Sequence, residues 1–332
     1  CKPKSLSPLD ALMFYVGIIY RKGSAMQRKP KKLIARNTKQ DQVFIVLMLL
    51  PAILLVVMFI YYPFLSGVPN AFKRYSLLNL TRTKWIGLRN FRTLFRDPNF
   101  LLTIPNTIKW VFVSLFFQFT IGFMLAMFLK NKFRGRGLYQ GAIFFPWAVS
   151  GFLIGILWRW LYNASYGPLN ALLVMIGVTD LANPVGFLSS VNLAMPSTIV
   201  ANIWYGIPFF TIMIQAALQG VPEELYEASE VDGAGKVYQF FKITVPYIYP
   251  VLITTTLLRS IWIFNFADLI YAITRGGPAG STEIMTSYML NLIMYQSDFG
   301  MASAVGIVII AILLVWCTLY LRISNVEKAG DY

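Results

Sequence analysis

Apolar residues gather in long runs that short polar segments separate. Five of these runs hold about 20 or more largely apolar residues, the last being a little shorter, and about 20 residues in a helix cross the hydrocarbon of a bilayer. A sixth run, 246–272, is interrupted by Arg259 and Asp268 but is long enough to cross. The uninterrupted runs are 43–65, 107–129, 138–162, 193–218 and 306–321. The pattern predicts an all-α integral membrane protein with six transmembrane helices.

Two shorter apolar patches, 9–20 and 169–178, cannot span the hydrocarbon. Such segments lie at the membrane interface or pack on a bundle, so 9–20 is predicted to form an N-terminal interfacial helix. Within the long runs, Gly151 and Gly155 are spaced for close contact between helices. Pro146 and Pro208 are expected to bend the helices that contain them.

Lysine and arginine positions predict the orientation. Ten precede the first long run and four lie in 130–137, whereas 163–192 holds none. Because cytoplasmic loops carry the excess of basic residues, both termini and the segments 130–137 and 221–245 are expected in the cytoplasm. The loop 66–106 disagrees with this trend, since it faces the other side with seven cations and one acid: Lys73, Arg74, Arg82, Lys84, Arg89, Arg92, Arg96 and Asp97.

These features divide the chain into four predicted segments. Residues 1–42 are a basic cytoplasmic segment with the interfacial helix, and 43–105 are the first transmembrane helix with the basic extracytoplasmic loop. Residues 106–322 are a helical core that includes a polar cytoplasmic segment at 221–243, and 323–332 are a cytoplasmic tail.

Composition narrows the function classes. Of 332 residues, 57% are hydrophobic, 13% are charged and none is histidine, so a histidine base or metal ligand is excluded. The chain also has no phosphate-binding loop and no dinucleotide-binding glycine motif. Its two cysteines, Cys1 and Cys317, make no disulfide framework, although Cys1 could be a lipidated terminus. We expect a non-enzyme without its own cofactor, metal or nucleic-acid partner.

The polar segment 221–246 lies between two runs that are too apolar for water. It predicts two short helices joined at Asp232-Gly233, because glycine can adopt the backbone angles that end a helix. Glu223, Glu227 and Glu230 share one face of the first helix. The second carries an apolar stripe of Val237, Phe240 and Phe241. Together these faces suggest a docking surface, the alternative being a solvated helix that rests on the membrane.

The spacing within this segment resembles the EAA signature of bacterial ABC importer permeases. That signature is E-A-A, three residues, G, nine residues and I-x-L-P. The chain has Glu227-Ala228-Ser229, Gly233 and Ile243-x-Val245-Pro246 at those positions, with Ser229 and Val245 as small departures. A second stretch, from Phe266-Ala267-Asp268 through Gly276-Gly277-Pro278 to Thr282, is similar to a segment of the maltose-type, multiple-sugar branch of that family.

The resemblance implies a type I ABC importer permease fold in the bacterial inner membrane. It also implies partners: a second homologous permease, expected to differ from this chain, two ATPase subunits that bind ATP and Mg²⁺, and an extracytoplasmic solute-binding protein. The segment 221–243 would insert into the ATPase and pass on its closure. The coupling residues implied by the match and its neighbours are Glu223, Glu227, Ala228, Ser229, Asp232, Gly233, Ala234, Phe240 and Phe241.

Arg259 is predicted about 13 residues, roughly 20 Å, beyond the cytoplasmic start of its helix and thus near mid-membrane. An arginine at that depth costs about 3 kcal/mol unless it meets a polar cavity or partner. Alignment with the maltose-type permeases implies a substrate pathway through Asn202, Gly206, Phe209, Arg259, Trp262 and Ile263. The alternatives for Arg259 are a structural pair with an acid on a partner chain, or snorkelling.

Arginine offers two parallel donors that suit a carboxylate. Together with the basic loop 66–106, this suggests an acidic cargo, such as a uronate oligosaccharide of alginate or pectin type. Contact of the loop with an acidic binding protein or with lipid headgroups explains its charge equally well. A neutral oligosaccharide or a glycerophosphate remains an alternative cargo. An ion-coupled secondary transporter is a further alternative, although the chain shows no internal repeat.

Overall fold

The computed structural model describes residues 39–131 and 133–324. The predicted interfacial helix at 9–20, Cys1 and the tail from residue 325 lie outside the described residues. The chain divides into two compact units, 1–63 and 64–332.

The first unit contributes a single long apolar helix. It comprises α2 (Lys39–Val56), the π-helical turn η1 (Val57–Tyr61) and the beginning of α3 (Tyr62–Gly67). Residues Val43–Phe72 form a candidate membrane span, of which the most apolar stretch has no buried residue. A helix that is apolar on every side is stable only within lipid or against other protein.

The second unit holds the rest of the described chain. Before the bundle it forms η2 (Val68–Phe72), β1 (Lys73–Arg74), η3 (Leu77–Arg82), β2 (Lys84–Trp85) and α4 (Arg89–Leu94), with β1 and β2 antiparallel in the register Lys73 to Trp85. The bundle contains α5 (Pro98–Lys130), α6 (Arg136–Phe144), η4 (Phe145–Ala148), α7 (Gly151–Leu161), α8 (Pro168–Met175), α9 (Val191–Gln219), α10 (Glu223–Val231), α11 (Lys236–Gln239), η5 (Phe240–Thr244), α12 (Val245–Phe264), α13 (Ala267–Ile273), α14 (Met285–Met294) and α15 (Phe299–Ile323).

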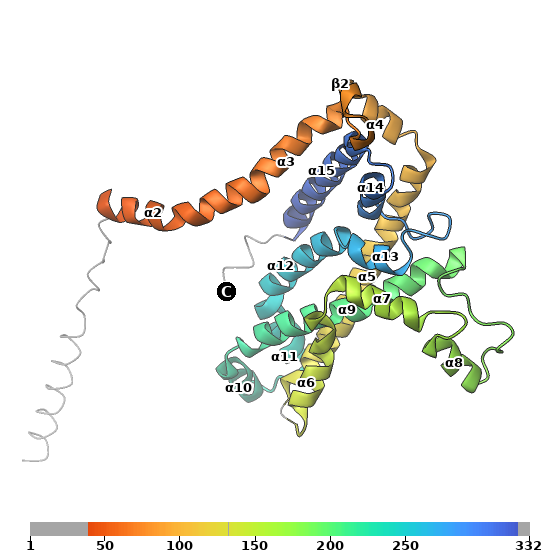
Figure 1. Ribbon diagram of the computed structural model, residues 1–332. Helices are drawn as coiled ribbons and strands as arrows, with labels where there is room; N and C mark the ends of the chain where they lie inside the picture. Colours follow the sequence, from red (N-terminus) through yellow and green to blue (C-terminus); the bar gives the residue numbers. More distant parts are fainter. Residues whose placement is uncertain (1–38, 132, 325–332) are drawn as a thin grey trace, which may run out of the picture. The chain divides into compact units, whose positions relative to one another are not determined.

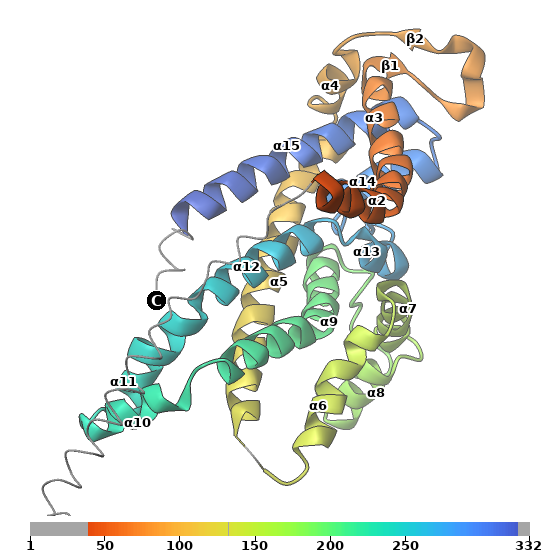
Figure 2. The same ribbon diagram turned by 90° about the vertical axis from the view of Figure 1, so that its left-hand side faces the viewer.

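The core of this unit forms where α5, α9 and α12 pack side by side (Figures 1 and 2). Gly122 on α5 lies so close to α9 that a Cβ atom there would stand 2.6 Å from the Cβ of Phe210. Predicted close contact at Gly151 and Gly155 is confirmed, because added Cβ atoms would collide with Phe266 and Ala272. Buried aromatic residues such as Phe209 fill the space between the helices.

The third predicted span is not one straight helix. The run 138–162 breaks between η4 and α7, and the two halves differ in direction by 101°. Pro146, which was expected to bend its helix, lies in the first turn of η4 just before this break and lacks an N–H for the helical ladder. The Ser150 side chain then caps α7 by accepting from the Leu153 N–H. Within the described residues, five helices are long enough to cross a membrane, or six if this bent pair is one span.

The boundaries of the sixth predicted span were also wrong. At its start, α11, η5 and α12 run continuously from Lys236 to Phe264, so the second helix of the polar segment is the beginning of a span. At its end, the chain breaks at Asn265 and Phe266, and Asp268 lies in the first turn of the separate helix α13. Hydropathy could not show these limits because apolar residues continue on both sides.

Candidate functional site

A chain of buried polar side chains links the three central helices. The Nε of Arg259 on α12 donates to Oε1 of Gln118 on α5 at 2.7 Å. Gln118 Nε2 donates in turn to the carbonyl oxygen of Asn202 on α9 at 2.8 Å. Asn202 Nδ2 then donates to Oγ of Ser114 at 3.0 Å, which closes the network back onto α5. We call these four residues the polar network.

The guanidinium of Arg259 is only partly satisfied. Arg259 is 3% exposed, its Nη2 has no hydrogen-bond partner, and its charged end lies 5.8 Å from the centre of the Phe209 ring. No carboxylate of the described residues pairs with it. An unsatisfied buried donor costs about 1–3 kcal/mol, and more when it is charged. The geometry therefore leaves one donor available for a further acceptor that enters when the helices separate.

The other predicted pathway residues surround this network. A Cβ at Gly206 would collide with the Gln118 amide, so only glycine leaves room for the network. Phe209 and Ile263 are fully buried, and the Ile263 carbonyl accepts from the Trp110 indole at 2.9 Å. Trp262 is 43% exposed and its ring lies 5.2 Å from that of Phe209. Thus Trp262 is the pathway residue that presents an open face.

Sequence reasoning missed Gln118 and Ser114. Both are polar residues inside a run of apolar ones, and this isolation is a signal that could have identified them. A polar side chain within a span is costly unless it has a partner.

The second predicted site is formed by α10, α11 and η5, and we call it the elbow. It turns at Gly233, whose φ of +79° lies in the left-handed region that glycine tolerates. Tyr226 and Thr244 bond through their hydroxyls at 2.8 Å, and Gln239 Nε2 donates to Oγ of Ser229 at 3.0 Å. These bonds join the two sides of the turn and fix its angle.

The outer surface of the elbow combines charge with apolar area. Phe241 is 62% exposed and Val237 is 74% exposed, whereas Phe240 turns inward and its ring lies 5.9 Å from that of Phe123. Ala234 is half-buried. The exposed polar and small residues of the predicted coupling set are Glu223, Glu227, Ala228, Asp232 and Gly233. Glu230, which shares the acidic face with Glu223 and Glu227, is also exposed.

Lys130 connects the elbow to the bundle. This last residue of α5 lies 4.3 Å above the Tyr226 ring and donates to the Tyr226 hydroxyl at 3.2 Å. A cavity of about 690 Å³ opens beside it and is lined also by Glu223, Glu230 and Lys236. Sequence reasoning missed Tyr226, Gln239 and Lys130 as positioning residues, because only the fold brings them together.

At the other end of the bundle, the segment 274–283 forms a tight loop. Thr282 Oγ1 donates to the Gly277 carbonyl at 2.8 Å, and Asn106 Nδ2 on α5 donates to the carbonyls of Gly280 and Glu283, both at 3.1 Å. Burial raises the pKa of the Glu283 carboxyl, an effect that its hydrogen bond from Asn291 partly opposes. Asn106 thus fixes this loop to the core.

The basic loop presents three arginines together. Arg89, Arg92 and Arg96 lie on one side of α4 and its end, where they line an open hollow of about 500 Å³. No acidic residue lines this hollow in the described chain. The concentration of positive charge expected from the sequence is therefore present at the bundle end that carries α4.

Comparison with known proteins shows which protein family this chain resembles. The chain is 32% identical over 284 residues to the trehalose/maltose transport system permease protein MalF of Thermococcus litoralis, covering 85% of this chain and 94% of the relative. It is 30% identical over 306 residues to the sulfoquinovosyl glycerol transport system permease protein SmoG of Agrobacterium fabrum, covering 91% and 98%.

A solved structure shares the fold. The crystal structure of a bacterial alginate ABC transporter in complex with an alginate pentasaccharide-bound periplasmic protein contains a chain that matches with a TM-score of 0.76 and 26% identity, over 90% of this chain and 99% of that one. Residues 118–325 match the model of the family described as binding-protein-dependent transport system inner membrane component. The chain therefore belongs to this family of multi-pass ABC importer permeases, and it is a transport subunit of the inner membrane rather than an enzyme.

Proposed function

We propose that this chain is a permease subunit of an ATP-driven importer for an acidic saccharide. Two relatives are named for saccharide or glycoside transport, and two of the crystal structures similar to this chain are of a transporter of the acidic polysaccharide alginate. Family membership supports import that depends on a binding protein, so the ion-coupled alternative is not retained. Both termini and the elbow would face the cytoplasm, in keeping with the distribution of basic residues.

The elbow supports coupling to separate ATPase subunits. Its acidic face and the exposed Val237 and Phe241 offer a mixed surface of the kind that a cleft on another protein can enclose. The chain itself has no phosphate-binding loop, so two ATPase partners would bind ATP and Mg²⁺. Closure of these partners would push on the elbow, whose internal hydrogen bonds keep it rigid.

A second permease would complete the membrane part. The span Val43–Phe72 is almost entirely apolar and has no buried residue in its most apolar stretch. A companion permease would cover part of that surface and supply the other wall of the pathway. An extracytoplasmic binding protein would deliver the saccharide to the end of the bundle that carries α4.

Arg259 carries the proposal of an acidic cargo. It is the charged member of the polar network, it meets only neutral groups of the described chain, and its Nη2 is unsatisfied. A sugar carboxylate would accept a hydrogen bond from Nη2 and also neutralise the charge of Arg259. A neutral hydroxyl would accept the hydrogen bond alone. Trp262, with its open face close by, could stack on a sugar ring.

The test is uptake by the assembled transporter in proteoliposomes. We expect Arg259→Gln to lower uptake of an acidic uronate oligosaccharide at least tenfold more than uptake of a neutral maltodextrin, each delivered by its binding protein. Arg159→Gln, at an exposed arginine of α7, is the matched control and should change neither. Equal loss for both sugars would favour the neutral oligosaccharide that the relative named for trehalose and maltose suggests.

A further inference from the structure

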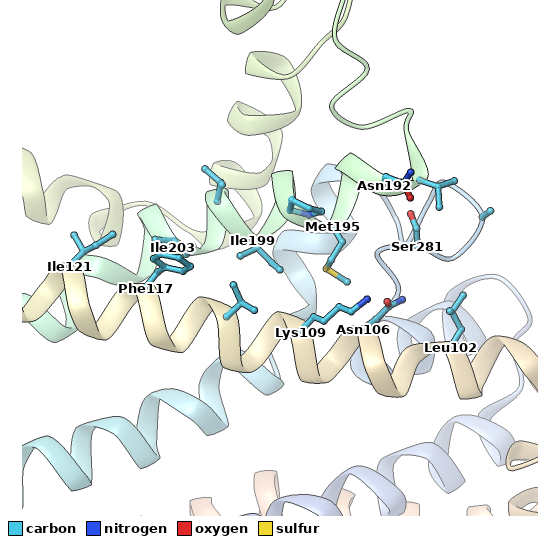
Figure 3. A pocket seen from close by; sticks show the side chains of 15 residues that line it. Leu102, Asn106, Lys109, Phe117, Ile121, Asn192, Met195, Ile199, Ile203 and Ser281 are labelled. Atoms are coloured by element: carbon cyan, nitrogen blue, oxygen red, sulfur yellow. The ribbon is translucent and has the colours of Figure 1, made fainter.

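A long groove follows α5 and α9 on a face that the polar network does not use. Its volume is about 800 Å³. From α5 it is lined by Leu102, Asn106, Lys109, Val113, Phe117 and Ile121, and from α9 by residues that include Asn192, Met195, Ile199, Val200 and Ile203 (Figure 3).

Polarity changes from one end of this groove to the other. Figure 3 shows Lys109, Asn106, Asn192 and Ser281 gathered toward one end, which Leu102 closes, with the Lys109 ammonium turned toward Asn106. Phe117, Ile121 and Ile203 lie at the other end (Figure 3). The groove therefore has a charged, polar head and an apolar trough, which is the pattern of a single phospholipid.

The depth of the groove agrees with that pattern. Lys109 and Lys130 are separated by 21 residues of one helix, about 31 Å at helical rise, which matches the thickness of the hydrocarbon. Lys109 therefore lies at the headgroup level of one leaflet and Lys130 at that of the other. From Lys109 to Ile121 the groove extends about 18 Å, close to the depth of one leaflet.

The charge at the head of the groove has no counterpart. No acidic residue lines the groove, and no ion pair joins Lys109 to a carboxylate in the described part of the chain. Asn106 already donates to the carbonyls of Gly280 and Glu283, so Lys109 is the charged donor that remains for a ligand, and the Ser281 hydroxyl beside it has no hydrogen-bond partner either. A phosphate is complementary to an ammonium at this depth.

We propose that this groove binds one anionic phospholipid, with its phosphate at Lys109 and an acyl chain along Val113, Phe117 and Ile121. A saccharide fits the site poorly, because the trough offers its hydroxyl groups apolar side chains instead of hydrogen-bonding partners. A helix of a companion permease would leave the Lys109 ammonium without an acceptor unless it supplied an acid at that height. The inference does not depend on the nature of the cargo.

The experiment measures lipid binding to the assembled transporter. The complex is delipidated in detergent, and native mass spectrometry follows the binding of dioleoylphosphatidylglycerol and, in parallel, of dioleoylphosphatidylcholine. We expect a tight site for phosphatidylglycerol, which Lys109→Gln weakens about tenfold without changing the weaker binding of phosphatidylcholine. Arg159→Gln removes an exposed charge outside the groove and should leave both unchanged.

A second pair of variants tests the trough. Val113→Trp fills the groove at an exposed position beside Lys109, and it should reduce occupancy by both lipids at the tight site. Val315→Trp adds the same bulk on α15 at an exposed position outside the groove and should have no effect. Unchanged phosphatidylglycerol binding in Lys109→Gln, equal loss of both lipids in that variant, or cross-linking of Val113→Cys to a companion permease would each overturn the proposal.

Discussion

The polar network and the elbow use polar residues in opposite ways. All four members of the network, Ser114, Gln118, Asn202 and Arg259, are buried, and their partners belong to the same unit. In the elbow, hydrogen bonds lie inside the turn while acidic and apolar side chains remain exposed. The network can therefore contact a ligand only when the helices separate. The elbow can be bound by a partner protein without any change in its own conformation.

Two long helical elements connect these regions. α5 contacts the elbow through Lys130 and the network through Gln118, which is about 18 Å away along the helix. The helical stretch from Lys236 to Phe264 begins in the elbow and contains Arg259. A force on the elbow would therefore reach the contact between Arg259 and Gln118 from both of its sides.

The largest expected effect comes from Gly233. Its φ of +79° is unfavourable for any side chain, and a β-branched residue there costs at least about 1–2 kcal/mol, although the surrounding space is open. We expect Gly233→Val to reorient the elbow and to lower uptake at least tenfold, together with stimulation of ATP hydrolysis by the loaded binding protein. Both are measured on the assembled transporter.

Gly235 provides the matched control. It also has open space around it, but its φ of −74° suits valine. Gly235→Val should keep uptake within about twofold of the wild type, because β-branched residues favour extended backbone. Equal inhibition by the two variants would show that surface bulk, and not the direction of the turn, determines coupling.

The second largest effect is expected when the polar network loses a hydrogen bond. Gln118→Leu removes the acceptor of Arg259, and a buried hydrogen bond to a charged group is worth about 1.5–3 kcal/mol. We expect a corresponding loss in the free energy of unfolding, measured in detergent with urea. Adding Arg259→Met should restore part of the loss, since it removes the stranded charge. If the double variant is less stable than Gln118→Leu alone, the charge is compensated by something other than Gln118.

The sequence alone predicted the membrane class, the apolar runs and the turn at Gly233, because each depends on local composition or on one residue. It predicted a bend in the helix that contains Pro146, but not a change in direction as large as 101°, and it did not predict the break at Asn265, where apolar residues continue on both sides. A hydropathy pattern measures burial in lipid, and it contains little information about helix direction.

Some residues of the candidate sites were predicted from the sequence and others were missed, because a local pattern does not contain information about contacts between distant segments. Arg259 stood out as a charge inside an apolar run, and Asn202 and Gly206 followed from the family resemblance. Their partner Gln118 is 141 residues away from Arg259. The Lys109 groove likewise depends on how α5 packs against α9. Contacts between distant segments require the fold, since no local pattern specifies them.

Glu283 offers an intermediate case between the buried network and the exposed elbow. It is half-buried, and burial raises its pKa above the ordinary value of 4.5. The fold therefore favours the neutral carboxyl. Its contribution to stability is fully present below pH 4.5 and is lost as the pH rises through the raised pKa. Relative to Glu283→Gln, the wild-type protein should lose stability across that window, by less than about 1.4 kcal/mol for each pKa unit.

Asn291 gives this prediction its control. Its Nδ2 donates to Oε1 of Glu283 at 2.5 Å, a hydrogen bond that lowers the Glu283 pKa and opposes the effect of burial. Asn291→Leu should therefore raise the pKa further and move the loss of stability to higher pH, as measured by thermal unfolding at a series of pH values. If Glu283→Gln and the wild-type protein respond to pH in parallel, Glu283 is solvated like a surface acid, and the loop at 274–283 belongs with the exposed elbow in the comparison.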